Sequence, residues 1–272
     1  MAGSPRGRFG LGWVPDLPDH RDLAYSAPLP QLRQLPSAAD LRPQFPWPPY
    51  DQGPIGSCTA NAIAGAIQYD RAKSRQSPDF TPSRLMIYYN ERAMEHSIPL
   101  DAGAQIRDGI KSVAKQGACK EATWPYEVTE ADPQTQLFPQ NSPPVTKPPA
   151  AAYQEAQAYE AISYFRVQQS LAQMKGCLAD GFPIVMGFSV YESMYDSHGN
   201  PVKVLPMPSG TDNQIGGHAV LLVGYEDSKQ VFTVRNSWGP NVQDHGHFYM
   251  PYSYAVDSDL ASDFWTIRSM KT

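Results

Sequence analysis

Cys58 is the residue of this sequence best placed to act as a nucleophile. It follows residues 52–57, Q-G-P-I-G-S, and begins a predicted helix, where free backbone N–H groups and the helix macrodipole stabilise a thiolate. Gln52, six residues upstream, brings a side-chain amide that could donate to an oxyanion. A cysteine is more often a small buried apolar residue, but a helix-starting cysteine behind a glycine-rich turn favours nucleophilic catalysis.

Of the six histidines, His218 has the setting of a general base. It lies in G-G-H-A-V-L-L-V-G-Y at the start of a predicted strand, which would hold its ring rigidly while two glycines leave space beside it. Asn236, in V-R-N-S-W-G, ends the next predicted strand, so a hairpin would bring it beside His218 to orient the imidazole and fix its tautomer. Trp238 would cover that hydrogen bond from water.

The remaining metal- and redox-capable residues do not form a recognisable site. His245 and His247, in D-H-G-H-F, lack a third ligand at a recognisable spacing, so we expect surface histidines and neither a metal nor another cofactor. Cys119 and Cys177 could pair or stay free. The N-terminus lacks the apolar segment of a secretory signal, which favours free thiols and either a cytoplasmic location or export by a route without a Sec signal.

Composition excludes several classes of protein. The 272 residues carry a net charge of -5 and no run of Lys or Arg, which argues against a nucleic-acid partner. No apolar stretch approaches the ~18–20 residues of a membrane span. We expect a monomer.

Helices are predicted in the first half of the chain and strands in the second, which is typical of an α+β fold. The predicted helices are 58–75 with Ser57 as N-cap, 82–94 with Thr81 as N-cap, 104–116 and 168–179. The predicted strands are 184–190, 218–225, 231–236 and 247–251. Prolines, 27 in all, concentrate in residues 1–49 and 133–149, which should be extended or turning.

Three motifs, in order, resemble those of the papain-like cysteine peptidases: Q-x-x-x-G-S-C, x-H-A-V-x-x-V-G-Y and R-N-S-W-G. The segments L-P-S-A-A-D-L-R, E-A-T-W-P-Y and G-F-P-I-V-M-G-F-S-V extend the resemblance from about Leu35, and I-G-S-C-T-A-N-A resembles a bacterial branch. The resemblance implies a two-lobe fold, with a helical left lobe, an antiparallel β-barrel-like right lobe and the active site in the cleft between them. It divides the chain into an arm (1–34), a helical lobe carrying the nucleophile (35–150) and a β-rich lobe carrying His and Asn (151–272).

The sequence also departs from the family pattern. Thr59 stands where the family has an aromatic residue after the nucleophile, and Ile55 stands where many relatives have a disulfide cysteine. Gly217 replaces the acid that often precedes the histidine. The separation of 160 residues between Cys58 and His218 exceeds the ~130–150 of the type enzymes, which predicts an insertion at 191–215.

The resemblance implies a thiol protease, a hydrolase acting on proteins or peptides. Cys58 would attack the carbonyl, with His218 and Asn236 completing a triad and Gln52 donating to the oxyanion. An ion pair with His218 would depress the pKa of Cys58 to ~3–4 and make the enzyme active at mildly acid to neutral pH. No pair of adjacent histidines that could occlude the cleft is visible, which favours an endopeptidase. A catalytically silent peptide-binding protein and a Cys-His deamidase or transamidase remain alternatives.

The substrate-side residues follow from the resemblance alone. Gly103 resembles the glycine whose backbone pairs with substrate. The pocket for the residue two before the scissile bond would be apolar and roomy, favouring a hydrophobic or aromatic side chain, and would be bordered by Ile106, Gly187, Gly216, Gly217 and Ala219. A turn glycine or a core aliphatic residue is the alternative interpretation at each position.

The arm is expected to act as a pro-segment. Residues 12–30 would pack over the groove between the lobes and restrain activity until displaced or cut, anchored by Trp13, Val14, Leu17, Leu23 and Tyr25. A disordered or purely structural strap is the alternative. The segment 16–22, D-L-P-D-H-R-D, is expected to be a solvated charged turn.

Overall fold

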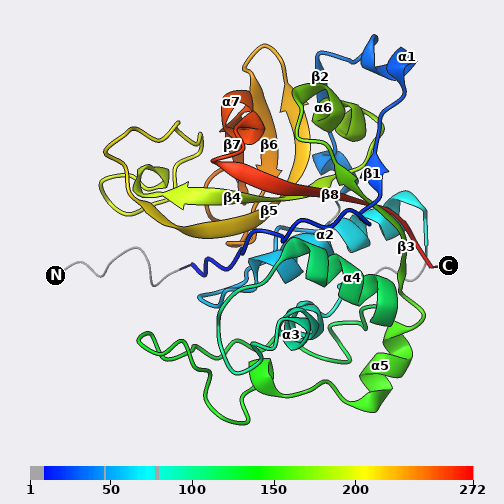
Figure 1. Cartoon of the computed structure of the whole chain (residues 1–272), viewed down its shortest axis with the longest axis vertical. Helices are drawn as coiled ribbons and strands as arrows, with labels where there is room; N and C mark the ends of the chain where they lie inside the picture. The colour runs from blue at the N-terminus through cyan, green and yellow to red at the C-terminus, as the bar shows by residue number, and fades with distance from the viewer. Residues whose placement is uncertain (1–8, 46, 77–79, 272) are drawn as a thin grey trace.

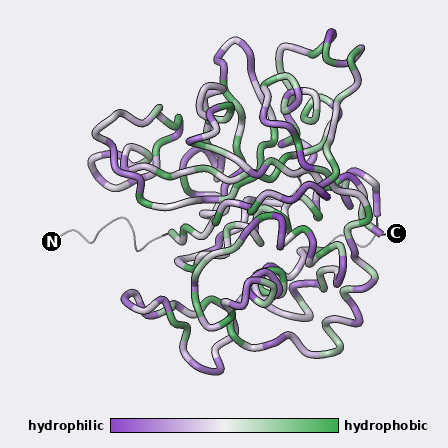
Figure 2. The backbone as a smooth tube through the Cα atoms, viewed as in Figure 1, coloured by the Kyte–Doolittle hydropathy of each residue, from purple (hydrophilic) through white to green (hydrophobic). Residues whose placement is uncertain are grey.

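The long helix α2 (Cys58–Lys73) lies between a group of helices and a sheet of eight strands, as the computed structural model in Figure 1 shows. The structure describes residues 9–45, 47–76 and 80–271. Every residue of α2 from Cys58 to Arg71 is buried, which explains its content of alanine and glycine: a Cβ added at Gly65 would already touch Leu221 of the sheet. The hydrophobic residues gather along the strands and α2, and the outer loops are more hydrophilic (Figure 2).

The predicted helices are confirmed, with shifts at their starts. The second begins at Arg84 and not at Pro82, because Ser83 rather than Thr81 caps it by accepting from the Met86 N–H. Ser57 is at the N-cap of α2 but makes no capping bond through its side chain. The helices are α1 (Leu29–Leu32), α2, α3 (Arg84–Met94), α4 (Ile106–Gln116), α5 (Ala150–Ala156), α6 (Leu171–Ala179) and α7 (Tyr252–Val256).

The sheet has the strand order β1-β3-β8-β4-β5-β6-β7, with β2 also paired to β5. All four predicted strands are confirmed, although β5 begins four residues earlier than expected. Only the β1–β3 pair is parallel among the described strands, and these strands do not close into a ring. The strands are β1 (Ala24–Tyr25), β2 (Ala38–Asp40), β3 (Ala161–Val167), β4 (Ile184–Tyr191), β5 (Gln214–Glu226), β6 (Val231–Arg235), β7 (His247–Pro251) and β8 (Ala261–Met270).

The second proline-rich segment belongs to the helical side of the molecule. It leads into α5, and Ala152 and Ala156 of α5 pack with Met86 of α3 and with Cys119. The chain therefore crosses to the sheet after α5, between residues 157 and 160. The expected insertion forms the connection from β4 to β5 over residues 192–213, and it is tied back to the sheet by a bridge between Val204 and Tyr249.

From residue 24 onward the arm is built into the β-rich side. β1 pairs with β3, the Ala27 N–H donates to Gln173, and the Gln31 side chain donates to the Gly176 carbonyl on α6. Trp13 is buried and Tyr25 half-buried as expected, but the predicted anchoring by Val14, Leu17 and Leu23 is wrong, because these side chains are exposed by 38%, 69% and 67%.

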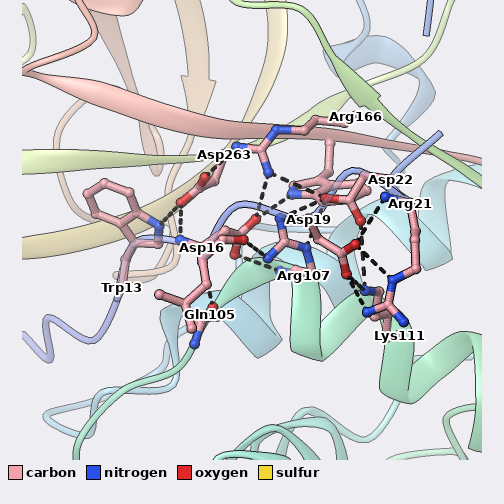
Figure 3. Close-up of polar contacts among 12 residues, drawn as sticks. Trp13, Asp16, Asp19, Arg21, Asp22, Gln105, Arg107, Lys111, Arg166 and Asp263 are labelled. Atoms are coloured by element: carbon pink, nitrogen blue, oxygen red, sulfur yellow. Dashed lines mark hydrogen bonds and ion pairs between the residues drawn. The ribbon is translucent and has the colours of Figure 1, made fainter. Parts of the chain in front are cut away.

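Polar contacts hold the arm where hydrophobic anchors were expected. The segment 16–22 is only in part the solvated turn that was expected: residues 17, 18, 20 and 21 are exposed, but the Asp16 side chain is fully buried and that of Asp22 is 5% exposed. Figure 3 shows both carboxylates facing Arg107 of α4 and Arg166 of β3, with Asp22 2.7 Å from Arg107 and Asp16 3.3 Å from Arg166. The pattern D-L-P-D-H-R-D indicated a charged segment, but it did not indicate that Arg107 and Arg166 would pair with its carboxylates.

A buried carboxyl lies behind the start of α2. Thr59 donates to Glu91 of α3 at 2.8 Å, and the second carboxyl oxygen of Glu91 is buried with no hydrogen-bond partner among the described residues. Burial raises the pKa of Glu91 well above its ordinary value. Thr59, which stands where the family has an aromatic residue, thus forms a hydrogen bond that links α2 to α3. None of the helices in the described ranges is both long and apolar enough to cross a membrane.

We expect Glu91→Gln to stabilise the protein above neutral pH. The folded state holds the proton of Glu91 while the unfolded chain releases it at about pH 4.3, so the wild type loses stability as pH rises from about 5 toward the raised pKa, whereas the neutral amide of the variant loses none. Thermal melting at pH 5 and pH 8 should show a gain of roughly 1 kcal/mol, a few degrees in Tm, at pH 8 only. Glu127→Gln, at an exposed position, is the matched control; equal shifts in both variants would contradict a buried neutral Glu91.

Candidate active site

Cys58 is the first residue of α2 and is fully buried. The backbone N–H of Ala219, on β5, donates to its sulfur at 3.3 Å, and the backbone of Gly12 in the arm also acts to lower its pKa. Burial nevertheless raises the pKa of Cys58 to about 12. This is opposite to the depressed pKa expected from the resemblance, because the thiol is fully buried.

His218 lies on β5, paired with Phe188 of β4 and also fully buried. Its Nε2 is 2.8 Å from Asn236 Oδ1, whereas its Nδ1 is buried with no hydrogen-bond partner among the described residues. Burial lowers the pKa of His218 to about 4, against the opposing effect of the Asn236 hydrogen bond. Both Cys58 and His218 are therefore neutral in this arrangement, and Nδ1 is the nitrogen still available to take a proton.

The Asn236 amide is fixed from both ends. Its Oδ1 also accepts from the Ser237 N–H at 2.8 Å, and its Nδ2 donates to Gln243 at 2.8 Å. Trp238 stacks on the His218 ring, with ring centroids 4.8 Å apart, and is 2% exposed. The imidazole is consequently held at one nitrogen and along one face.

Gln52 is buried, and its orientation is set by Ser237, a residue that was not predicted from the motifs. Ser237 Oγ donates to Gln52 Oε1 at 2.6 Å, so the amide nitrogen points the other way. That nitrogen donates to the carbonyl of Ile55 at 2.9 Å and to the carbonyl of Gly10 in the arm at 3.0 Å. The position of Ser237 inside the R-N-S-W-G motif could have indicated its role in orienting Gln52. No feature of the sequence indicated that Gln243 would bond to Asn236.

The arm backbone lies between these groups and bonds to both sides of the molecule. On the helical side, Gly10 donates to Gly53 at 3.1 Å, Ala104 donates to Gly12 at 2.8 Å, and Val14 donates to Ala104 at 3.0 Å; on the sheet side, Trp13 donates to Gly217 at 3.0 Å. Phe9 stacks on Trp238 at 4.6 Å. A groove of about 260 Å³ continues beside the arm, lined by residues that include Leu11, Gly56, Asp101 and Ile215.

The residues predicted to border the substrate pocket surround this segment of the arm. A Cβ at Gly187 or Gly217 would overlap Trp13, and one at Gly216 would overlap Leu11. The backbone pairing expected at Gly103 is made by Ala104, one residue later, while Gly103, at φ +71°, lets Gly12 approach closely. Ile106 and Ala219 are fully buried.

The other cysteines and histidines lie apart from this site. Cys119 and Cys177 are buried free thiols, as is Cys58. His247 is not a surface residue as expected, since it is 8% exposed at the start of β7, and burial lowers its pKa to about 4. Within the described ranges, no cluster of three or more His, Cys, Asp or Glu side chains could hold a metal ion.

Comparison with known proteins agrees with the fold and the motifs. The model of the papain family cysteine proteases matches residues 35–265. The chain is similar to the crystal structure of xylellain, a cysteine protease from Xylella fastidiosa, with 48% identity, 96% of each chain covered and a TM-score of 0.92. It is 36% identical to an uncharacterized peptidase C1-like protein of Acanthamoeba polyphaga mimivirus, over 96% of this chain and 87% of the relative. The α+β papain-like fold is thus confirmed, and the chain belongs to the papain family of cysteine proteases.

Proposed function

We propose that this protease is an endopeptidase that works through Cys58, His218 and Asn236, with Gln52 and the Cys58 backbone N–H as oxyanion donors. The observation that carries the proposal is the continuous hydrogen-bond path from Gln52 through Ser237 and Asn236 to His218, whose neighbour in the chain, Ala219, donates its backbone N–H to the sulfur of Cys58. Each of these groups has a fixed orientation before any substrate binds, which is the preorganisation that catalysis requires.

The chemistry follows from these positions. Nδ1 of His218 takes the Cys58 proton, and the thiolate attacks the peptide carbonyl to give a tetrahedral oxyanion held by the two N–H donors. The C–N bond breaks as His218⁺ gives its proton to the leaving amine. Water, deprotonated by His218, then cleaves the thioester and restores the thiol. Asn236 keeps Nε2 bound throughout, so that Nδ1 remains the nitrogen that exchanges protons.

We further propose that the arm holds the enzyme in an inactive form. The carbonyl of Gly10 occupies the Gln52 donor, and Gly12 and Trp13 cover Cys58 and the predicted pocket. In the arm, the residue in the predicted pocket, Trp13, comes after the residue whose carbonyl is bound by Gln52, Gly10. In a substrate, the residue in that pocket would come before the residue whose carbonyl is bound by Gln52. The arm therefore runs opposite to a substrate and presents no bond for attack. Its removal would rehydrate Cys58 and His218 and permit their ion pair.

The arm should be displaced at its first residues and retained beyond them. Residues 16–34 are bonded to α4, β3, β8 and α6, and their loss would leave the buried Arg107 without its ion-pair partner and Asp263 without the bond from the Asp16 N–H. A truncation at residue 35 would therefore confuse release of the cleft with destabilisation of the fold.

A single substitution in the full chain tests the inhibition. A Cβ at Gly12 would lie 1.9 Å from the carbonyl oxygen of Gly56, so Gly12→Val cannot occupy the cleft, whereas Gly210, with nothing within 4 Å, provides a matched Gly210→Val control. We expect Gly12→Val to raise the rate of Cys58 labelling by the epoxide E-64, and the rate of peptide hydrolysis, at least tenfold. Equal rates in the two variants would exclude inhibition by the arm.

The reaction itself is tested with Gly12→Val and a peptide library read by mass spectrometry. Endopeptidase activity gives two fragments whose masses together exceed that of the intact peptide by one water, deamidation adds about one mass unit without a break, and a silent binder leaves every mass unchanged. We expect fragments, and we expect both hydrolysis and E-64 labelling to be lost in Cys58→Ala. Intact peptides with a labelled Cys58 would rule out the peptidase.

The role of Ser237 is tested separately. Ser237→Ala removes the hydroxyl that orients Gln52, so in the Gly12→Val chain we expect kcat to fall roughly 10-fold, below the ~10²–10³-fold loss typical of deleting an oxyanion donor, with KM nearly constant. Ser228→Ala, which removes an exposed hydroxyl bonded to Glu226, is the control. A change confined to KM would show that Ser237 does not act through the oxyanion.

A further inference from the structure

The sheet leaves part of one edge strand without a partner. β3 lies between β8 and β1 (Figure 1), but β1 pairs only with residues 166 and 167, so residues 161–165 have no neighbouring strand on that side within the described ranges. The opposite edge of the sheet, at β7, is closed by the bridge between Val204 and Tyr249. Sheet edges are usually covered or blunted, because their free N–H and C=O groups pair with other chains.

The backbone of β3 presents bonding groups on its free side. The Arg166 N–H points away from β8, since it donates to the Leu23 carbonyl at 2.8 Å. The pairing with β8 is regular from Tyr164 to Arg166, and backbone groups two residues apart in a strand point to the same side. The N–H and C=O of Tyr164 therefore face the free side, where an added strand would find a donor and an acceptor.

A groove of about 690 Å³ lies along this edge. It is lined by residues 162–165 of β3, residues 21–23 of the arm and Lys111 of α4, and we call it the β3-edge groove. Residues 21–23 directly precede β1, yet the parallel pairing does not continue through them, because a turn in which the Asp22 N–H bonds the Asp19 carbonyl bends the arm there. The groove thus lies where a further strand would run, and five residues of strand span about 17 Å.

The rim of the β3-edge groove is both apolar and positively charged. Leu23 and Ile162 are 67% and 63% exposed. Arg21 and Lys111 lie at the outer end of the charged cluster (Figure 3), and their side chains are 87% and 30% exposed, whereas that of their shared partner Asp19 is 15% exposed. A protein that approaches this edge consequently meets two aliphatic side chains and the cationic members of the ion pairs.

We propose that the β3-edge groove binds an extended segment of another protein as an added strand, and that this segment alternates apolar and acidic residues. Main-chain bonds to β3 would provide affinity, and the apolar side chains would cover Leu23 and Ile162. The carboxylates would pair with Arg21 and Lys111. A second copy of this chain fits less well, since pairing through the same edge would bring two identical cationic rims together. None of these residues belongs to the proposed catalytic machinery.

Binding is tested with the full chain carrying Cys58→Ala, so that the peptide stays intact, and the fluorescein-labelled peptide V-E-V-E-V-E. We expect saturable binding, followed by fluorescence anisotropy, with a Kd below about 1 mM. The peptide V-K-V-K-V-K should bind at least tenfold more weakly, because its charges are repelled by the rim. V-E-V-E-V-E with every backbone amide N-methylated should not bind, because it cannot donate to β3.

Two further measurements locate the site. Ile162→Asp puts a like charge beside the carboxylates of the peptide and should weaken binding at least tenfold, whereas Val204→Asp, at a 56% exposed position on the opposite edge, should bind as the parent does. Saturating peptide should slow hydrogen exchange at the Tyr164 amide and leave residues 203–205 unchanged. The proposal would be overturned by no binding below about 1 mM, by equal binding of the lysine or methylated peptide or of Ile162→Asp, or by a dimer that Ile162→Asp dissociates.

Discussion

The backbone of residues 10–14 is the contact on which the proposed control of the active site depends. It forms hydrogen bonds to Gly53 and Ala104 on the helical side and to Gly217 on the sheet side, so one extended segment spans both halves of the molecule. Cys58 and His218 are fully buried in this arrangement, and burial moves their pKa values apart, to about 12 and about 4. A thiol and an imidazole with such values do not form the ion pair that nucleophilic attack requires.

The hydrogen bonds that orient His218, Asn236 and Ser237 do not involve residues of the arm. The Asn236 amide bonds His218, Ser237 and Gln243, and Ser237 in turn fixes Gln52. Buried polar networks of this kind specify one arrangement because every broken bond leaves an unpaired group in a medium of low dielectric constant. In the proposed release of the arm, these bonds would keep the geometry of the site while its hydration changes.

The arm is anchored by Asp16 and Asp263, which belong to one charged cluster. Asp16 fixes the arm to Arg166 and to Trp265, and Asp263 binds both the Asp16 backbone and the Trp13 ring nitrogen. Because Asp16 is bonded independently of Trp13, the contacts of Asp16 do not require the Trp13 side chain to stay in place.

Much of the fold could be predicted from local patterns. The helix at Cys58 and the strands at Ile184, His218 and Val231 follow from apolar runs bounded by turn residues, and the motifs around Cys58, His218 and Asn236 indicated which side chains meet. The strands β3 and β8 were not predicted, since register shifts interrupt their pairing and the left-handed Asp263 breaks the alternation of β8.

The sequence by itself determined the family, and it predicted the nucleophile, its base and the amide that orients the base, because each depends on residue type and order within short motifs. Only the tertiary structure decided what the arm does with them. That Gly10 meets Gln52, that Asp16 is buried rather than solvated, and that Asp263 ends beneath Trp13 are contacts between residues up to 250 positions apart. No local propensity encodes such contacts, since they arise from how the lobes, the sheet and the arm pack together.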